Sequence, residues 1–229
     1  MRRRLLVLAG AVALAAALCP APPATARVGV APGMAIVLES GGACTLGFLA
    51  GNDAGRRLGV TAGHYAQGVG ELVYNKYGDV IGEVVAQQGD GSVLADGFGV
   101  TILVLADDVE IPDAFFTRYA NPRPGDPVHK YGSTTAETGG TIGTVTLDAD
   151  YPRYSVMRSA LTASPGDSGS PWYGEDESGP VLYGITIGHL TDADNGAELG
   201  AYGFPIDALV AYVRDGSGTW GPGFIPAGR

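Results

Sequence analysis

Short runs of β-branched and aromatic residues alternate along the chain with turn-forming residues. The 229 residues include 37 glycines and 15 prolines, which separate the apolar runs at fairly even intervals. Runs of this kind, bounded by glycine and proline, are typical of strands. They predict strands at residues 35–38, 45–49, 58–61, 71–74, 80–85, 98–105, 127–131, 141–147, 154–158, 181–187 and 201–204. About a dozen strands at this spacing indicate an all-β barrel or sandwich.

One segment near the C-terminus has a helical pattern instead. In residues 207–214 the apolar positions fall on one face, and Asp207 is available as an N-cap. These features predict a short C-terminal helix. No linker, repeat or low-complexity tract interrupts residues 27–229, so the length permits one or two domains. Two small barrels packed together suit both the length and the number of strands.

The first 26 residues have the composition of a secretory leader. Residues 2–4 are arginines, residues 5–18 form an apolar run, and Ala24-Thr25-Ala26 is a small-residue site suited to signal peptidase. The apolar run spans 14 residues, fewer than the roughly 20 that a membrane-spanning helix needs. We therefore predict a signal peptide at residues 1–26 and a soluble, secreted mature chain.

Charge and cysteine content exclude several functions. Loss of the leader removes three arginines and no acids, so 14 basic residues become 11 against 24 acidic ones, a net charge of −13. Such a surface repels phosphate backbones, so nucleic acid is not an expected partner. Cys44 alone remains in the mature chain, which excludes an intramolecular disulfide and predicts a buried small apolar residue. Three histidines and one mature cysteine show no metal-ligand spacing, so no metal is expected.

Three short segments carry candidate catalytic residues. His64 ends the strand-to-turn segment 58–64, where an exposed imidazole suits a general base. Ser168 is flanked by glycines, which permit tight backbone conformations and close approach of a substrate. In such a turn the N–H groups of Gly166 and Ser168 would form an oxyanion hole. Asp96 lies between the two, directly before an apolar strand, and a carboxylate beside an imidazole fixes its tautomer.

Each segment taken alone has an ordinary structural explanation. A single histidine is commonly structural, Gly-Asp-Ser-Gly forms plain turns, and an aspartate before a strand is commonly a cap. Together, however, His64, Asp96 and Ser168 follow the order of chymotrypsin-type triads, with successive members 32 and 72 positions apart.

Two of these segments resemble the signature segments of chymotrypsin-like serine peptidases. They are Thr61-Ala62-Gly63-His64 and Gly166-Asp167-Ser168-Gly169-Ser170-Pro171. Residues 44–48, 132–135 and 204–205 are similar, in the same order, to segments of the bacterial streptogrisin-like and α-lytic-like members. The resemblance covers most of residues 35–214.

The resemblance implies a fold and a reaction. The fold is all-β: two packed six-stranded antiparallel barrels, approximately residues 34–115 and 116–214, with a short C-terminal helix, within a peptidase domain at 27–229. The function is that of a secreted serine endopeptidase that hydrolyses peptide bonds of protein or peptide substrates through an acyl-enzyme. We expect no cofactor and no membrane partner, and we expect a monomer. The implied catalytic residues are His64, Asp96 and Ser168, with the amides of Gly166 and Ser168 as the oxyanion hole.

Several positions depart from the family pattern. Tyr65 stands where relatives have a cysteine, which leaves Cys44 without its usual partner, and the region before Ser168 also lacks a cysteine. Both usual disulfides are therefore absent. Gly97 is an extra residue between the acid and the strand, which leaves Asp90 and Asp107 as rivals of Asp96 for the triad acid.

By the same resemblance, a substrate pocket is walled by residues 160–165, 184–189 and 200–202. Thr162 occupies the place of the acid of trypsin-like enzymes. A Lys or Arg side chain would find no carboxylate there, and an unpaired buried charge is costly, so trypsin-like cleavage is disfavoured. His189 is expected near the pocket mouth, where it either contacts an acidic side chain or narrows an apolar slot.

Two other functional classes are weighed against the peptidase. An α/β-hydrolase esterase needs Gly-x-Ser-x-Gly between a strand and a helix, with the acid and histidine downstream. Here Ser170 breaks that motif and Pro171 opposes a helix. A non-catalytic binding protein on a chymotrypsin-like fold is the remaining alternative, because folds are reused without their chemistry.

Overall fold

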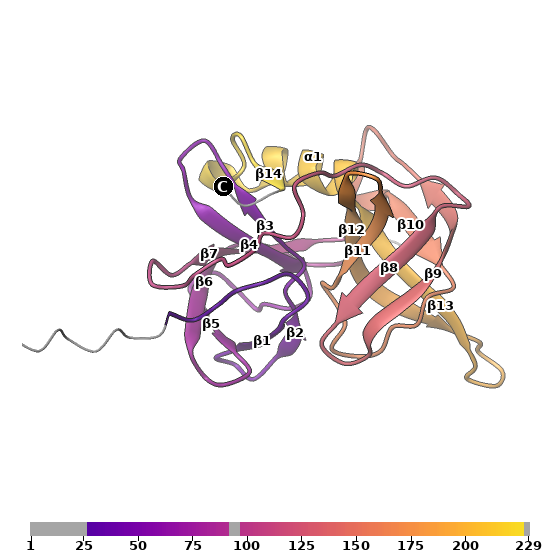
Figure 1. The fold of residues 1–229 in the computed structure, drawn as a ribbon, viewed down its shortest axis with the longest axis horizontal. Helices are drawn as coiled ribbons and strands as arrows, with labels where there is room; N and C mark the ends of the chain where they lie inside the picture. Colours follow the sequence, from indigo (N-terminus) through magenta and orange to yellow (C-terminus); the bar gives the residue numbers. More distant parts are fainter. Residues whose placement is uncertain (1–26, 92–96, 227–229) are drawn as a thin grey trace, which may run out of the picture.

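The computed structural model describes residues 27–91 and 97–226. Two β-rich units lie side by side, and a C-terminal helix runs over their junction (Figure 1). The predicted leader, residues 1–26, and Asp96 lie outside the described residues. Within the described ranges, no helix is long and apolar enough to cross a membrane.

The first unit is an open antiparallel sheet in the strand order β14-β3-β4-β7-β6-β5-β1-β2. Its strands are β1 (Ala35–Leu38), β2 (Ala43–Thr45), β3 (Phe48–Gly51), β4 (Arg57–Ala62), β5 (Leu72–Asn75), β6 (Val80–Gln88), β7 (Val100–Leu105) and β14 (Ile225–Pro226). The sheet curves around its own buried apolar side chains, which include Ile36, Leu46, Leu49, Val73, Ile81, Val84 and Leu103.

The second unit is a closed barrel of six strands in the order β10-β13-β12-β11-β8-β9. Its strands are β8 (Pro127–Gly132), β9 (Ala136–Thr146), β10 (Val156–Ser159), β11 (Pro171–Asp176), β12 (Gly179–Thr191) and β13 (Glu198–Pro205). Because the barrel is closed, each strand has a hydrogen-bonded neighbour on both sides along most of its length. The barrel encloses a smaller cluster of buried side chains around Trp172, Met157 and Leu161.

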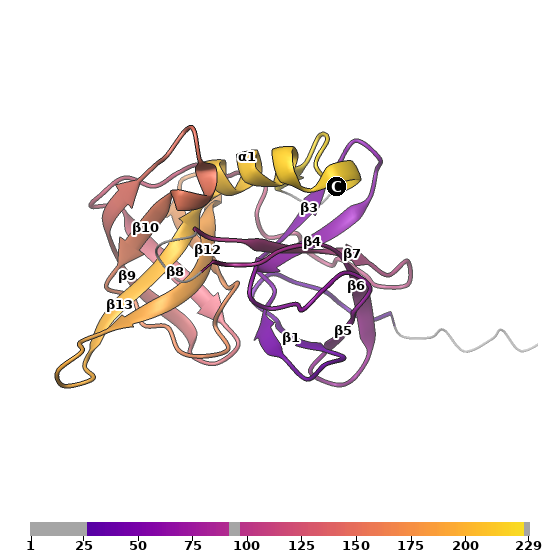
Figure 2. The ribbon, with the colours of Figure 1, turned by 180° about the vertical axis from the view of Figure 1, so that it is seen from behind.

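The largest apolar cluster joins the two units. Val60 and Ile102 from the first unit pack in it with Ile185 and Phe204 from the second, and Leu209 of the helix completes it. The helix, α1 (Ile206–Gly216), lies against this junction, as the view from behind shows (Figure 2). Burial of so many apolar side chains stabilises one relative placement of the two units. The ends of β4 and β12 are thereby held close to each other.

The all-β class, the two packed units and the C-terminal helix predicted from sequence are confirmed. The six-stranded count applies to the second unit, whereas the first is an open half-barrel of eight strands. The predicted strand 45–49 is two strands, because the chain bends at Gly47, where a Cβ would lie 2.5 Å from the carbonyl oxygen of Gly169. Asp207 is not the N-cap: Pro205 holds that position and Asp207 lies in the first helical turn.

Strand β11, which begins at Pro171, was not among the predicted strands. Proline is tolerated at the first position of a strand, where its missing N–H costs little. The predicted strands at 141–147 and 181–187 are longer in the structure, as β9 and β12, because polar and glycine residues extend both ladders beyond the apolar runs.

The place of the absent disulfide is filled by packing. Cys44 is a free, buried thiol, and Tyr65 is 6 % exposed in the same apolar cluster of the first unit. The Tyr65 hydroxyl forms no hydrogen bond with any residue in the described ranges. A buried hydroxyl without a partner has lost its hydrogen bonds to water and forms none in the protein, which lowers the free energy of unfolding.

We predict that Tyr65→Phe raises the free energy of unfolding by about 1 kcal/mol, because it removes the unpaired hydroxyl and keeps the buried ring. Urea denaturation of residues 27–229 measures the change. Tyr151→Phe is the matched control, because Tyr151 is 64 % exposed and its substitution should change stability by less than about 0.5 kcal/mol. A lower stability for Tyr65→Phe would show that the hydroxyl has a partner.

Candidate active site

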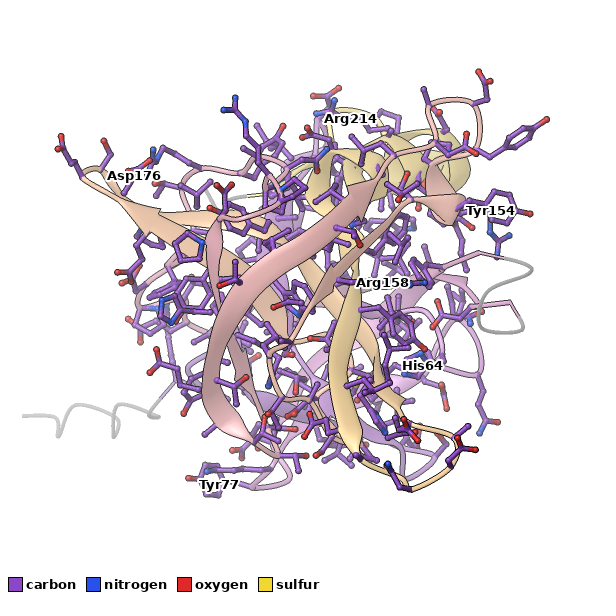
Figure 3. All side chains as sticks on the ribbon, turned by 90° about the vertical axis from the view of Figure 1, so that its right-hand side faces the viewer. His64, Tyr77, Tyr154, Arg158, Asp176 and Arg214 are labelled. Carbon is purple, nitrogen blue, oxygen red and sulfur yellow. The ribbon has the colours of Figure 1, made fainter. Side chains whose placement is uncertain are left out.

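His64 lies in the tight turn that follows β4, and its side chain is labelled in Figure 3. Gly63 precedes it, and a Cβ at that position would collide with the backbone of Gln88 and Gly99. Only glycine therefore lets this turn lie directly against the end of β6 and the start of β7. The His64 side chain is 44 % exposed, so its ring is open to a substrate.

Asp90 orients the His64 ring. It follows β6, and one of its carboxylate oxygens contacts His64 Nδ1 while the other accepts the backbone N–H of Gly99. The carboxylate is 10 % exposed. An acceptor at Nδ1 keeps the proton on that nitrogen and leaves Nε2 free to accept one.

Asp90 is one of the rivals that the sequence left open for this role. Asp96 lies outside the described residues, so its position relative to His64 stays a prediction. Asp107 is exposed in the turn after β7. The opposite end of β7 is the one near His64, because Val100 pairs with Ala62. Of the acids in the described ranges, Asp90 is the one that contacts His64.

The turn that carries Ser168 packs against the end of β4. Gly169 has φ of 83°, and a Cβ there would lie 3.1 Å from the backbone nitrogen of Ala62. The carbonyl of Ser168 accepts hydrogen bonds from the Thr45 N–H at 3.0 Å and from the Cys44 thiol at 2.7 Å. The serine turn therefore lies beside the strand that ends at His64.

The side chains of His64 and Ser168, both described, form no hydrogen bond with each other. In proteins without bound substrate such contacts are often long and tighten in the complex. The neighbouring thiol does not compete for the role of nucleophile, because burial raises the pKa of Cys44 to about 11.

Two backbone N–H groups of the serine turn are free to bind an anion. Among the described residues, neither Gly166 nor Ser168 donates its N–H to an acceptor. The carbonyl of Pro165 accepts the Thr134 hydroxyl at 2.8 Å. Because N–H and C=O point in opposite directions across a trans peptide, the N–H of Gly166 points away from Thr134. Gly166 has φ of 99°, a conformation that favours glycine.

The turn is held from below by a buried ion pair that the sequence analysis did not find. Lys130 Nζ lies 3.2 Å from Asp167 Oδ2, and both side chains are 0 % exposed. Asp167 Oδ2 also accepts the Thr135 hydroxyl and the Ser164 N–H, and Asp167 Oδ1 accepts the N–H groups of Thr134 and Thr135. The sequence contained a signal for this burial, because Lys130 lies two residues after Val128 and therefore on the same inward face of β8.

These contacts keep Asp167 ionised. Burial alone would raise the pKa of Asp167, but the hydrogen bonds from Thr135, Ser164 and Thr134 outweigh it and lower that pKa. Burial lowers the pKa of Lys130, and the charge of Asp167 opposes that change. The residue directly before Ser168 is therefore a charged, fully bonded anchor.

A pocket of about 260 Å³ opens beside Ser168 between the serine turn and β12. His189 and Tyr202, which belong to the segments 184–189 and 200–202 named in the sequence analysis, line this pocket. Thr162 is not part of the lining: it is exposed, and its carbonyl accepts the Thr138 hydroxyl at 2.9 Å. No Asp, Glu, Lys or Arg side chain lines the pocket.

The polar groups of this pocket are few. The Thr186 hydroxyl is bonded to Ser170 Oγ and Trp172 Nε1 inside the barrel, so it is not available to a ligand. Burial, with a smaller effect of Asp90, raises the pKa of Tyr202, whose phenol stays neutral. The Glu198 carboxylate accepts the N–H of Ala163 at 3.0 Å but lies outside the lining.

Comparison with known proteins identifies the fold. No protein-family model and no curated protein matches the sequence. Among solved structures, Nocardiopsis protease is 22 % identical with a TM-score of 0.60, covering 80 % of this chain and 96 % of that one. Thermobifida fusca protease A is 20 % identical with a TM-score of 0.59, covering 81 % and 96 %. The chain therefore has the fold of chymotrypsin-like bacterial serine proteases.

A glutamic-acid-specific serine protease, described as using a histidine triad in substrate binding, is also similar. It is 27 % identical with a TM-score of 0.56, and the match covers 80 % of this chain and 97 % of that one. These neighbours confirm the fold family suggested by the two signature segments.

We predict that ionised Asp167 contributes stability that disappears in acid. Its folded pKa is lowered, so the contribution is present above the unfolded pKa of about 3.9 and is lost as the pH falls through the folded pKa. The difference in unfolding free energy between wild type and Asp167→Asn should be constant from about pH 5 to pH 7 and shrink below about pH 4. Urea denaturation at several pH values measures it.

Asp150→Asn is the matched control, because Asp150 is exposed and its side chain forms no hydrogen bond within the described ranges. An Asp167→Asn difference that stays unchanged down to pH 3 would contradict an ionised anchor.

Proposed function

We propose that this chain is a secreted serine endopeptidase in which His64, Asp90 and Ser168 form the catalytic triad. The observation that carries the proposal is the junction itself. Asp90 orients His64 from the first unit, and the serine turn of the second unit, with two free N–H groups, packs against the strand that ends at His64. The fold supports a peptidase, since its structural neighbours are serine proteases.

The reaction follows from these positions. Nε2 of His64 takes the hydroxyl proton of Ser168 as Oγ bonds to the peptide carbonyl carbon, and the N–H groups of Gly166 and Ser168 bind the negative oxygen. The C–N bond then breaks, and the imidazolium gives its proton to the leaving amine. Water repeats the sequence on the acyl-enzyme, with its proton passing through His64 to Ser168. No step needs a cofactor.

The choice of Asp90 over Asp96 rests on its contact with Nδ1. A carboxylate at that nitrogen stabilises the imidazolium that forms when Ser168 attacks. Asp96 remains the sequence-based candidate for the same position. The two assignments predict loss of activity on substitution of different residues, Asp90 in one case and Asp96 in the other.

An extended substrate has an open strand edge to pair with. β11 pairs with β12 only as far as Ile185, whereas β12 continues to Thr191 with β13 on its other side. Within the described ranges the edge of residues 187–191 is thus unpaired, next to the pocket. Extended peptides bind such edges through main-chain hydrogen bonds, and the side chain before the scissile bond would enter the pocket.

The pocket supports cleavage after uncharged residues. Its lining holds no acid to pair with Lys or Arg. The chain has three histidines in all; His64 is committed to Asp90, and His129 stacks on Tyr173 with ring centroids 5.6 Å apart. His189 alone reaches the pocket, so a histidine triad like the one described for the glutamic-acid-specific neighbour is not available here.

The remaining parts of the proposal come from the sequence. Residues 1–26 act as a cleaved signal peptide, and residues 27–229 form the peptidase domain, with units at about 34–115 and 116–214. The enzyme acts on proteins or peptides as a monomer.

We predict that a fluorophosphonate probe labels purified residues 27–229 and that Ser168→Ala abolishes labelling, because Ser168 Oγ is the nucleophile. Gel fluorescence after timed labelling measures the rate. A folded wild type that stays unlabelled would sink the peptidase proposal and favour a binding protein on this fold.

Asp90→Asn should slow labelling and peptide hydrolysis by about 10⁴, because it supports the wrong histidine tautomer. Asp96→Asn is the matched comparison and should change the rate by less than about threefold. The reverse pattern would return the triad role to Asp96.

We predict that kcat/KM for peptides with Lys or Arg before the scissile bond is at least about 100-fold below that for the best uncharged residue, because the pocket leaves their charge unpaired. Profiling a peptide library measures the preference. A preference for Lys or Arg that Glu198→Gln removes would show that Glu198 turns into the pocket and would contradict this prediction.

A further inference from the structure

A second groove, of about 370 Å³, lies where the two units meet. We call it the junction groove. Its walls come from residues 33–35 before and in β1, from residues 75–77 in the turn between β5 and β6, and from residues 131–136 at the β8–β9 hairpin. It shares no lining residue with the pocket beside Ser168.

The junction groove is connected directly to the serine turn. Ser133 and Thr134 line it, and their hydroxyls donate hydrogen bonds of 2.8 Å to the carbonyls of Gly166 and Pro165. Gly166 is two residues from Ser168. The groove therefore lies against the turn that carries Ser168.

The side of the turn decides which part of a substrate the groove would hold. Residues 163–165 and β12 enclose the pocket, which takes the residue before the scissile bond. The Thr134 hydroxyl binds the carbonyl of Pro165, which points away from the Gly166 N–H of the same peptide unit, and the Ser133 hydroxyl binds the carbonyl of Gly166. We infer that the junction groove binds the substrate residues that follow the scissile bond; this inference rests on the proposed peptidase function.

The groove presents an exposed aromatic ring on a rigid turn. The Asn75 side chain accepts the N–H groups of Tyr77 and Asp79 at 2.9 Å and 3.0 Å, and Asn75 itself is 6 % exposed. Tyr77 is 79 % exposed, and in Figure 3 it projects from the lower edge of the molecule. The backbone that carries the ring is thus fixed by hydrogen bonds, while the ring itself is open to a ligand.

Charge gives the groove a preference. Lys76 Nζ lies 5.1 Å from the centre of the Tyr77 ring, and the lining includes no Asp or Glu. The mature chain as a whole has 24 acidic and 11 basic residues, as counted from the sequence without its leader. Asp79, on the same turn, is bonded to the Asn75 amide at 2.9 Å and is not part of the lining. The substrate class is therefore a peptide with an acidic side chain at about the third or fourth position after the scissile bond.

The hairpin that forms the other wall is itself unusual. Ala136 has φ of 53°, a conformation rare for a residue with a Cβ. It closes the turn of residues 133–135 that supplies the hydroxyls to the serine turn. Strain of this kind persists where the surrounding contacts require one backbone shape. Here those contacts are the hydrogen bonds of Ser133 and Thr134 to the serine turn.

The test uses quenched fluorescent peptides with one constant sequence before the scissile bond. One peptide has a single leaving residue; the others have five, with Glu, Gln or Lys at both the third and fourth positions. For wild type we expect kcat/KM in the order Glu, Gln, Lys, with a Glu-to-Lys ratio of about tenfold. Lys76→Glu should reverse the order, and Tyr77→Ala should reduce the gain of the extended peptides over the single-residue one.

Tyr151→Ala is the matched control, an exposed tyrosine outside the groove that should leave the Glu-to-Lys ratio unchanged. A ratio near one in wild type, or a ratio that Lys76→Glu does not alter, overturns the inference even while the single-residue peptide is cleaved. If no peptide is cleaved, the proposed function fails separately. Calorimetric titration of Ser168→Ala with the acidic and basic leaving peptides then judges the groove alone: tighter binding of the acidic peptide supports it, and equal or no binding overturns it.

Discussion

The Asp167 carboxylate is the contact on which the geometry of the site depends. It accepts hydrogen bonds from the Lys130 ammonium and from both the hydroxyl and the N–H of Thr135. It also accepts the N–H groups of Thr134 and Ser164. Because the next residue is Ser168, every one of these contacts limits where that serine can lie. Even Gly132 is constrained, since a Cβ there would collide with Asp167 Oδ1. A fully bonded buried charge of this kind is costly to disturb, and it connects the β8–β9 hairpin to the oxyanion turn.

The proposed triad is divided between two units, so it also depends on their packing. His64 and Asp90 belong to the first unit and Ser168 to the second. The apolar cluster around Phe204 and Val60 holds the units together, in a chain where the one cysteine of the described ranges is a free thiol. Displacement of a catalytic group by about 1 Å costs on the order of 100-fold in rate. Core packing, and not a disulfide, therefore holds the described units together.

The pocket and the junction groove share no lining residue, and both adjoin the serine turn, an arrangement that fits a long substrate. One side of the turn offers the unpaired edge of β12 and a pocket without charged side chains. The other side offers Lys76 and Tyr77 on a rigid turn. Binding energy from both sides of the scissile bond can be used to orient the carbonyl against Ser168. A short ester substrate lacks the residues that would make these contacts.

Local patterns in the sequence determined the strands, the C-terminal helix and the segments around His64 and Ser168, because each depends on neighbouring residues and turn chemistry. Contacts between distant segments needed the tertiary structure. Asp90 reaches His64 because β6 ends beside the turn after β4. Lys130 reaches Asp167, 37 positions away, inside the closed barrel, while Thr162 is exposed and is not part of the pocket lining. A lysine or an aspartate has the same local pattern whether it is solvated or buried against a partner, so only the packing of strands far apart in sequence decided these roles.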